Sequence, residues 1–245
     1  RPSISQEAID EVVACIRSGW ITTGPRVKQF EDDLKAYLGA PQVLALTSAT
    51  AGLHLVLTAL RLQPGDEVIT TPMTFAATLN TIVLAGGRPV LVDVEPGTYN
   101  MDVTKIEQAV TRRTRAIMPV HMMGQPCHME RIMAIAGKHG LAVIEDACQA
   151  HLAEYQGKKL GAIAPLGCFS FQTSKTIACG EGGCIIGSDE ELMDRCYTVH
   201  NHGTSRPGRT ETIGPKYRMN ELEAALLLGQ LEGARERYLR RNENA

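Results

Sequence analysis

The sequence predicts an α/β protein with three layers, in which helices cover both faces of a mostly parallel, seven-stranded sheet. Short apolar runs alternate with longer segments of helical period through the first 146 residues, an order that is typical of parallel sheets. The apolar runs are nearly continuous, as strands buried on both faces require. Glycines follow the helical segments, where a left-handed cap is needed.

The pattern predicts each element in turn. Strands are expected at residues 42–47, 66–71, 88–94, 115–120, 141–146, 167–172 and 183–188. We expect the last of these to close the sheet in the antiparallel direction. Helices are expected at residues 48–62, 74–86, 102–110, 128–140 and 189–203, and one long amphipathic helix at residues 218–241, whose charged second half forms a solvated face.

Composition narrows the classes of function. The 245 residues suit one large domain or two, and the net charge of −2 gives no basic field for nucleic acid or an anionic membrane. No apolar run is long enough to cross a bilayer and no signal peptide opens the chain, so we expect a cytoplasmic protein. Residue 1 is Arg rather than Met, which indicates a processed chain or a piece of a longer one.

Seven cysteines occur without a C-x-x-C pair, and most lie in apolar surroundings. Reduced, buried thiols are therefore expected. A metal site built from Cys148, His151, Cys179 and Cys184 would match no familiar ligand spacing, and we expect no metal.

Taken one at a time, the polar and aromatic residues after the predicted strands have ordinary structural explanations. Lys175 fits a surface loop, and Asp146 follows a strand where an N-cap is common. Ser48 and Thr50 can also cap a helix, Phe75 can belong to the core, and the glycines of "GEGG" can form a turn.

Together, these groups fit one cofactor better. Ligands of open α/β sheets bind at the carboxyl ends of the strands. Residues 48–51 begin a helix there, and its free N–H groups and hydroxyls suit a phosphate. The Phe75 ring can stack on a flat ligand, the Lys175 amine can bond an aldehyde, and the Asp146 carboxylate can hold a pyridine nitrogen in its charged form. We therefore expect a pyridoxal 5′-phosphate site, with Lys175 and Asp146 as its catalytic residues.

Several motifs extend this expectation. The chain closely resembles the DegT/DnrJ/StrS family of pyridoxal-phosphate sugar aminotransferases through essentially its whole length, in "SGWITTGP", "TSATAGLHL", "PGDEVITTPMTFAATLN", "PVHMMGQP", "VIEDACQAHLAEYQGKKLG", "FSFQTSKTIACGEGG" and "GPKYRMNELEAALLLGQL". The family has the aspartate-aminotransferase fold, fold type I. The resemblance implies that residues 1–245 form its large, cofactor-binding domain with an N-terminal segment. "SGWITTGP" and "SATAG" are most similar to the branch that makes UDP-4-amino-4-deoxy-L-arabinose.

The resemblance also implies roles for single residues. Lys175 bonds the cofactor and Asp146 contacts the pyridine nitrogen. Gln149 lies against the ring near its hydroxyl, and Phe75 stacks on the other face. The remaining implied contacts are Thr50, Ala51 and Ser170 with the phosphate, and Trp20, Thr22 and Thr23 with the sugar.

The implied assembly is a homodimer whose two sites lie at the subunit interface, with "GPKYRM" reaching the neighbour's phosphate. Lys216 stands there where many members have Asn, and a cation also suits a phosphate. Leu152 replaces a small residue after "AH", so we expect the sugar pocket to differ. Family members continue into a small C-terminal domain that helps to close the site, and its absence here indicates a truncated sequence or a fragment.

The implied reaction moves an amino group from L-glutamate to a nucleotide-linked keto-sugar, in particular a UDP-4-keto-pentose or a related 4-keto-sugar. The products are 2-oxoglutarate and an amino sugar for cell-envelope polysaccharide, lipopolysaccharide, including lipid A modification, or antibiotics. The nucleotide base, the sugar and the aminated carbon stay open.

Three alternatives to this reaction are considered. A sugar dehydratase of the same fold would have His in place of Lys175. A non-catalytic cofactor- or sugar-binding regulatory protein would keep the fold without turnover. A nicotinamide dehydrogenase needs G-x-G-x-x-G after a strand, whereas "GEGG" follows the lysine loop.

Overall fold

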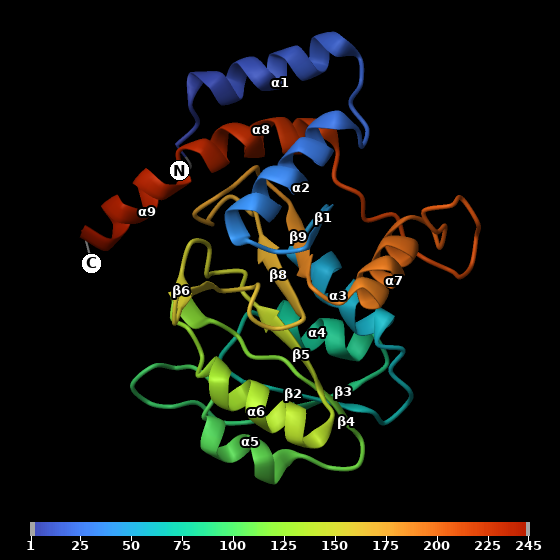
Figure 1. The fold of residues 1–245 in the computed structure, drawn as a ribbon, viewed down its shortest axis with the longest axis vertical. Helices are drawn as coiled ribbons and strands as arrows, with labels where there is room; N and C mark the ends of the chain where they lie inside the picture. The colour runs from blue at the N-terminus through green and yellow to red at the C-terminus, as the bar shows by residue number, and fades with distance from the viewer. Residues whose placement is uncertain (1–2, 244–245) are drawn as a thin grey trace.

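Seven strands form one mixed sheet in the order β1-β9-β8-β5-β4-β2-β3 (Figure 1). The computed structural model describes residues 3–243. Every neighbouring pair is parallel except the two pairs made by β9, which confirms the mostly parallel seven-stranded sheet. The strands are β1 Gln42–Leu46, β2 Glu67–Thr70, β3 Arg88–Leu91, β4 Thr114–Ile117, β5 Ala142–Asp146, β8 Leu166–Ser170 and β9 Gly183–Gly187.

The antiparallel direction of β9 is confirmed, but β9 does not close the sheet as its last strand. β9 lies between β1 and β8, because β1, the first strand of the chain, adds to the free side of β9. A two-stranded hairpin, β6 Glu154–Tyr155 and β7 Lys158–Lys159, stands outside the main sheet.

Helices cover both faces, as the three-layer prediction requires. Apolar side chains of α3 Ala49–Ala59, α4 Ala76–Leu84 and α7 Glu190–His200 pack on one face. Those of α2 Pro25–Leu38, α5 Val103–Ala109 and α6 Met129–His139 pack on the other. Within residues 3–243, no helix has both the length and the apolar character needed to cross a bilayer.

Two N-terminal helices were not predicted. α1 Gln6–Ser18 begins at Ser5, whose side chain accepts a hydrogen bond from the Ala8 amide, and ends at Gly19 in the left-handed conformation. Figure 1 shows α1 lying along α8 at one end of the molecule, opposite α5 and α6. α2 packs with Phe30 and Leu34, which are fully buried one turn apart.

The expectation of a single long helix at residues 218–241 is wrong. Two helices are present, α8 Glu221–Glu232 and α9 Ala234–Glu243. Asn220 and Glu223 form a capping box that starts α8. Gly233 follows its last turn as the C-cap residue, and glycine is among the weakest residues at continuing a helix.

Candidate active site

The lysine loop follows β8 and turns back to β9. Its tight turn is built by Gln172, whose side-chain oxygen accepts hydrogen bonds from the amide of Ser174 at 2.8 Å and from its hydroxyl at 2.7 Å. The Lys175 amide donates to the Gln172 carbonyl at 2.8 Å. At the base of the loop, the Thr173 amide donates to the Gly180 carbonyl at 3.0 Å. The backbone on both sides of Lys175 is therefore fixed by local hydrogen bonds.

The glycines after the lysine serve two different purposes. Gly180 has a φ of +98°, so it makes the turn that the sequence suggested. Gly183 instead permits close packing, because a Cβ there would lie 2.2 Å from the amide nitrogen of Ala49. Strand β9 can thus run directly against the start of helix α3.

Asp146 ends strand β5 and is only 6% exposed. Its backbone is held on both sides, since its amide donates to the Pro119 carbonyl at 2.9 Å and its carbonyl accepts from the His121 amide at 3.1 Å. Its carboxylate accepts from the Thr78 hydroxyl at 2.7 Å and from the Cys148 amide at 3.3 Å. The side chain is therefore oriented by α4 and by the turn that follows β5.

Helix α3 starts beside the same strand ends. Ser48 is its N-cap, and the Ser48 hydroxyl accepts from the Ala51 amide at 3.0 Å. The first intrahelical bond runs from the Gly52 amide to the Ser48 carbonyl. The amides of Ala49 and Thr50 precede that bond and have no acceptor within the helix, so they are available to an anion.

These elements enclose one cavity of about 520 Å³, a size that suits a cofactor. Six of the predicted site residues line it: Thr50, Phe75, Asp146, Gln149, Ser170 and Lys175. The cavity wall also includes Ser48, Ala49, Leu53, Thr74, Ala77, Val120, Cys148, Gln172, Ser174 and Glu181. Two other hollows of about 510 and 540 Å³ have no lysine among their described lining residues.

Within the cavity, Phe75 is 74% exposed and Ser170 is 9% exposed. Phe75 is the N-cap residue of α4, and its exposed side chain does not belong to the hydrophobic core. The Gln149 side chain accepts a hydrogen bond from the Met123 amide at 2.9 Å. An aromatic face, an amine and a carboxylate thus line one space.

Five predicted residues do not line this cavity. Ala51 is buried in α3 and its amide is occupied by Ser48. Lys216 is exposed and pairs through its backbone with Asn201. Trp20, Thr22 and Thr23 belong to the turn between α1 and α2, where the Trp20 ring nitrogen donates to the Thr23 carbonyl at 3.2 Å.

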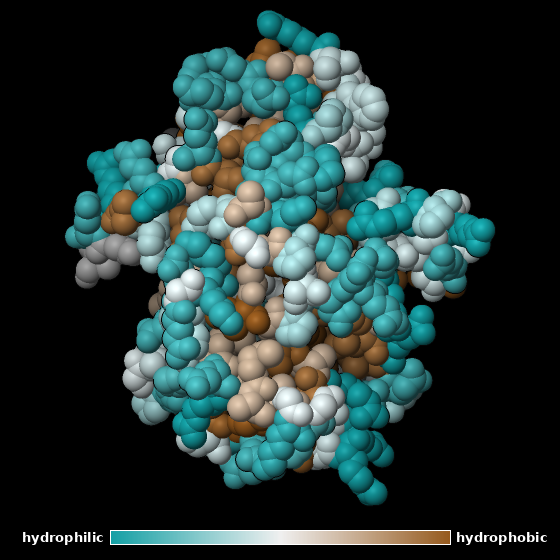
Figure 2. Space-filling model, viewed as in Figure 1, coloured by the Kyte–Doolittle hydropathy of each residue, from teal (hydrophilic) through white to brown (hydrophobic). Residues whose placement is uncertain are grey.

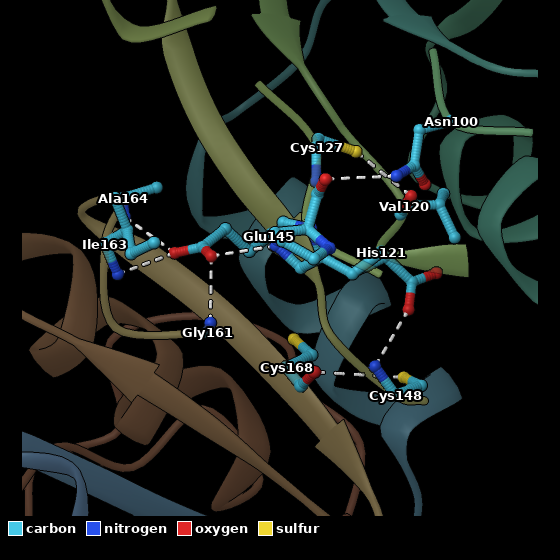
Figure 3. Close-up of polar contacts among 12 residues, drawn as sticks. Asn100, Val120, His121, Cys127, Glu145, Cys148, Gly161, Ile163, Ala164 and Cys168 are labelled. Atoms are coloured by element: carbon cyan, nitrogen blue, oxygen red, sulfur yellow. Dashed lines mark hydrogen bonds and ion pairs between the residues drawn. The ribbon is translucent and has the colours of Figure 1, made fainter. Parts of the chain in front are cut away.

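A buried polar network beside Asp146 was not predicted (Figure 3). Glu145 is fully buried, and one carboxylate oxygen accepts from the amides of Ile163 and Ala164 at 2.8 and 2.6 Å. The other oxygen bonds the Gly161 amide at 2.8 Å and the His121 ring at 2.9 Å. The sequence "VIED" predicts the end of a strand, but it does not predict the hydrogen-bond partners of Glu145.

The cysteines behave as expected for reduced thiols. All seven are free, and all are buried except Cys148, which is half-buried at the cavity wall. Burial raises the pKa of the Cys148 thiol well above its ordinary value, and the Asp146 charge raises it further. Among the described residues, no group of three or more His, Cys, Asp or Glu side chains is arranged to hold a metal ion.

Comparison with known families decides the class. A model of the DegT/DnrJ/EryC1/StrS aminotransferase family matches residues 2–245. The chain belongs to this family. The resemblance seen in the sequence motifs is thereby confirmed, and so is the fold type I architecture.

Individual relatives show how far the similarity reaches. The spore coat polysaccharide biosynthesis protein SpsC of Bacillus subtilis is 43% identical over 100% of this chain and 66% of its own length. The GDP-perosamine synthase of Caulobacter vibrioides is 40% identical over 94% of this chain and 63% of its own. The PLP-form structure of the putative sugar aminotransferase Spr1654 from Streptococcus pneumoniae matches with a TM-score of 0.90, at 33% identity, over 96% of this chain and 66% of that one. The chain spans about two thirds of the length of the curated relatives it matches.

The cofactor of this aminotransferase family is pyridoxal 5′-phosphate, and the residues present fit it. The cavity holds one lysine beside a carboxylate that neighbouring groups orient. It also holds an aromatic ring and the two N–H groups at the start of α3. Each chemical demand of the cofactor is therefore met by a residue on the cavity wall.

Proposed function

We propose that this chain forms the cofactor-binding part of an aminotransferase that moves an amino group from L-glutamate to a nucleotide-linked keto-sugar, a 4-keto-sugar in particular. The observation that supports it most is the presence of Lys175 and Asp146 in one cavity of about 520 Å³ with Phe75 and the start of α3. Relatives named for polysaccharide biosynthesis and for perosamine synthesis support a sugar as the acceptor.

The residues divide the work of binding. The amides of Ala49 and Thr50 and the Ser170 hydroxyl hold the phosphate, where the positive end of the α3 dipole favours an anion. Phe75 covers one face of the ring and Gln149 the other. Asp146 receives the pyridine N–H and keeps that nitrogen positively charged.

The residues also divide the chemistry. When bound, pyridoxal phosphate supplies an electron sink for the carbon that bears the amino group. Lys175 would be the residue that holds the cofactor aldehyde in the resting state, and substrate binding would free its amine. The freed Lys175 Nζ would then carry a proton between the substrate carbon and the former aldehyde carbon of the cofactor, which the amino nitrogen separates, as general base and general acid. Lys175 would serve the same proton-carrying role when the keto-sugar receives the amino group.

The proposed assembly is a homodimer with shared sites. Large apolar side chains lie exposed on and before α4, with Leu84 at 69% and Phe75 at 74% exposure, and Figure 2 shows hydrophobic surface over that part of the molecule. A second copy of the chain would cover these side chains and bring its Lys216 toward the phosphate. Sedimentation velocity tests this, and a chain that stays monomeric at every concentration would contradict it.

Absorbance and product analysis test the reaction. The chain loaded with pyridoxal phosphate is titrated with L-glutamate and then given a panel of nucleotide-linked keto-sugars, and amino-sugar products are identified by mass spectrometry. We expect Lys175→Ala to lose both the yellow absorbance and the transfer, and Asp146→Asn to fold but react slowly. Lys158→Ala, at an exposed position of strand β7, is the matched control. Normal turnover by Lys175→Ala would refute the proposal.

A further inference from the structure

The Asp146 carboxylate has a buried partner on α4 that no motif singled out. The Thr78 hydroxyl lies 2.7 Å from Asp146 Oδ2 and the Thr78 side chain is fully buried. An ionised carboxylate only accepts hydrogen bonds, so the hydroxyl must donate its single proton to Asp146. This contact joins α4 to the end of β5 across 68 residues of sequence.

A second hydroxyl completes the arrangement. Thr74 Oγ1 lies 2.7 Å from Thr78 Oγ1 and, since the Thr78 proton is already donated, Thr74 is the donor of this bond. Thr74 lines the cavity. A chain of two hydroxyls therefore runs from the cavity wall to the carboxylate, and each hydroxyl polarises the next.

The other contacts of the carboxylate are longer or involve only the backbone. Asp146 Oδ1 accepts a longer bond of 3.3 Å from the Cys148 amide, and the Cys148 thiol also interacts with the carboxylate. The bonds to Pro119 and His121 involve the Asp146 backbone and do not restrict rotation of the carboxylate. The bond from Thr78 is consequently the shorter of the two hydrogen bonds that orient the carboxylate.

We propose that Thr78 is a positioning residue for cofactor chemistry, holding Asp146 in the orientation that meets the pyridine nitrogen, with Thr74 supporting it. This inference rests on the proposed function, because only a bound pyridine gives the orientation of Asp146 a chemical use. Hydrogen bonds to a charged group are among the strongest between side chains. Loss of the Thr78 donor should therefore change how Asp146 meets the pyridine nitrogen.

The test compares three variants of the full chain loaded with pyridoxal phosphate whose ring nitrogen is ¹⁵N-labelled. Thr78→Val removes the hydroxyl at nearly constant shape. Thr78→Ser restores the donor with a smaller side chain. Thr81→Val is the matched control, because Thr81 is equally buried on the same helix but donates to the Thr78 carbonyl at 3.2 Å and not to Asp146. Thermal melting establishes that each variant is folded.

For Thr78→Val we expect the ¹⁵N shift to move toward the unprotonated ring at neutral pH, the cofactor to bind roughly 10-fold more weakly, and kcat to fall roughly 10- to 100-fold with KM for glutamate little changed. Thr78→Ser should stay within about threefold of the wild type, and Thr81→Val should match it.

Three results would overturn the inference: a wild-type ¹⁵N shift and kcat in Thr78→Val, equal impairment in Thr78→Ser, or equal impairment in Thr81→Val. Failure of the proposed function has a different signature. In that case the wild-type chain itself would form no yellow complex or transfer no amino group, and the inference would fall with it.

Discussion

Replacing Glu145 with Gln tests the buried network beside the cavity. The four donors around the carboxylate are the amides of Gly161, Ile163 and Ala164 and the ring Nε2 of His121. The His121 ring carries its proton on Nε2, because Nδ1 accepts from the Cys127 amide at 3.2 Å. All four groups can bond a carboxylate at once.

A glutamine side chain at position 145 can accept hydrogen bonds from only two of these four donors. Its oxygen accepts from one pair of donors, and its NH₂ group faces the other pair. If that other pair includes His121, a change of tautomer rescues the contact but leaves the Cys127 amide facing an N–H. Two buried donors therefore lose their partners in either orientation. At about 1–3 kcal/mol for each, Glu145→Gln should lower the free energy of unfolding by about 2–6 kcal/mol.

Equilibrium urea unfolding measures this change as a lower midpoint with an unchanged slope. Glu130→Gln, on an exposed position of α6, is the control and should stay within about 0.5 kcal/mol of the wild type. If Glu145→Gln unfolds with the same free energy as the control, the carboxylate does not anchor the 161–164 turn and the reasoning is wrong.

Two further predictions concern stability and packing. Burial raises the pKa of the Glu31 carboxyl from 4.5 to about 7, so the folded state binds an extra proton between these values and stability falls as pH rises through them. The free energy of unfolding of Glu31→Gln, measured relative to that of the wild type by denaturant unfolding, should therefore be about 1–3 kcal/mol higher at pH 8 than at pH 4. A difference that does not change with pH would contradict this. Gly183→Ala should weaken binding of pyridoxal phosphate and destabilise the fold by about 1–3 kcal/mol, because its methyl group would overlap the Ala49 backbone. Gly137→Ala, with open space around it, should be neutral or stabilising, and equal effects of the two in calorimetry would refute the packing argument.

The sheet was predictable because its strands are buried on both faces and their apolar runs alternate with helical periods. The order of the strands was less accessible. The sequence of residues 183–188 does not show that β9 pairs with β1, which lies far away in the chain. The break at Gly233 was missed because the apolar period continues through it, while the conformation at the end of α8 depends on local capping.

The candidate site was predictable where its groups lie at a strand end or in the loop that follows one, as Asp146, Phe75 and Lys175 do. Partners from distant segments were not. Thr78 lies inside a helix and resembles an ordinary core threonine in sequence, and its meaning appears only when α4 packs against β5. Ala51 was expected to contact the phosphate, whereas its amide donates a hydrogen bond to the Ser48 hydroxyl in the structure.

The covalent position of the cofactor tests the central claim most directly. The chain is loaded with pyridoxal phosphate and reduced with sodium borohydride, which makes the bond to the lysine permanent, and tryptic peptides are analysed by mass spectrometry. Modification of Lys175 in the wild type, with no modified peptide in Lys175→Ala, is the predicted result. A modification on another lysine, or an unchanged yield in Lys175→Ala, would contradict the account.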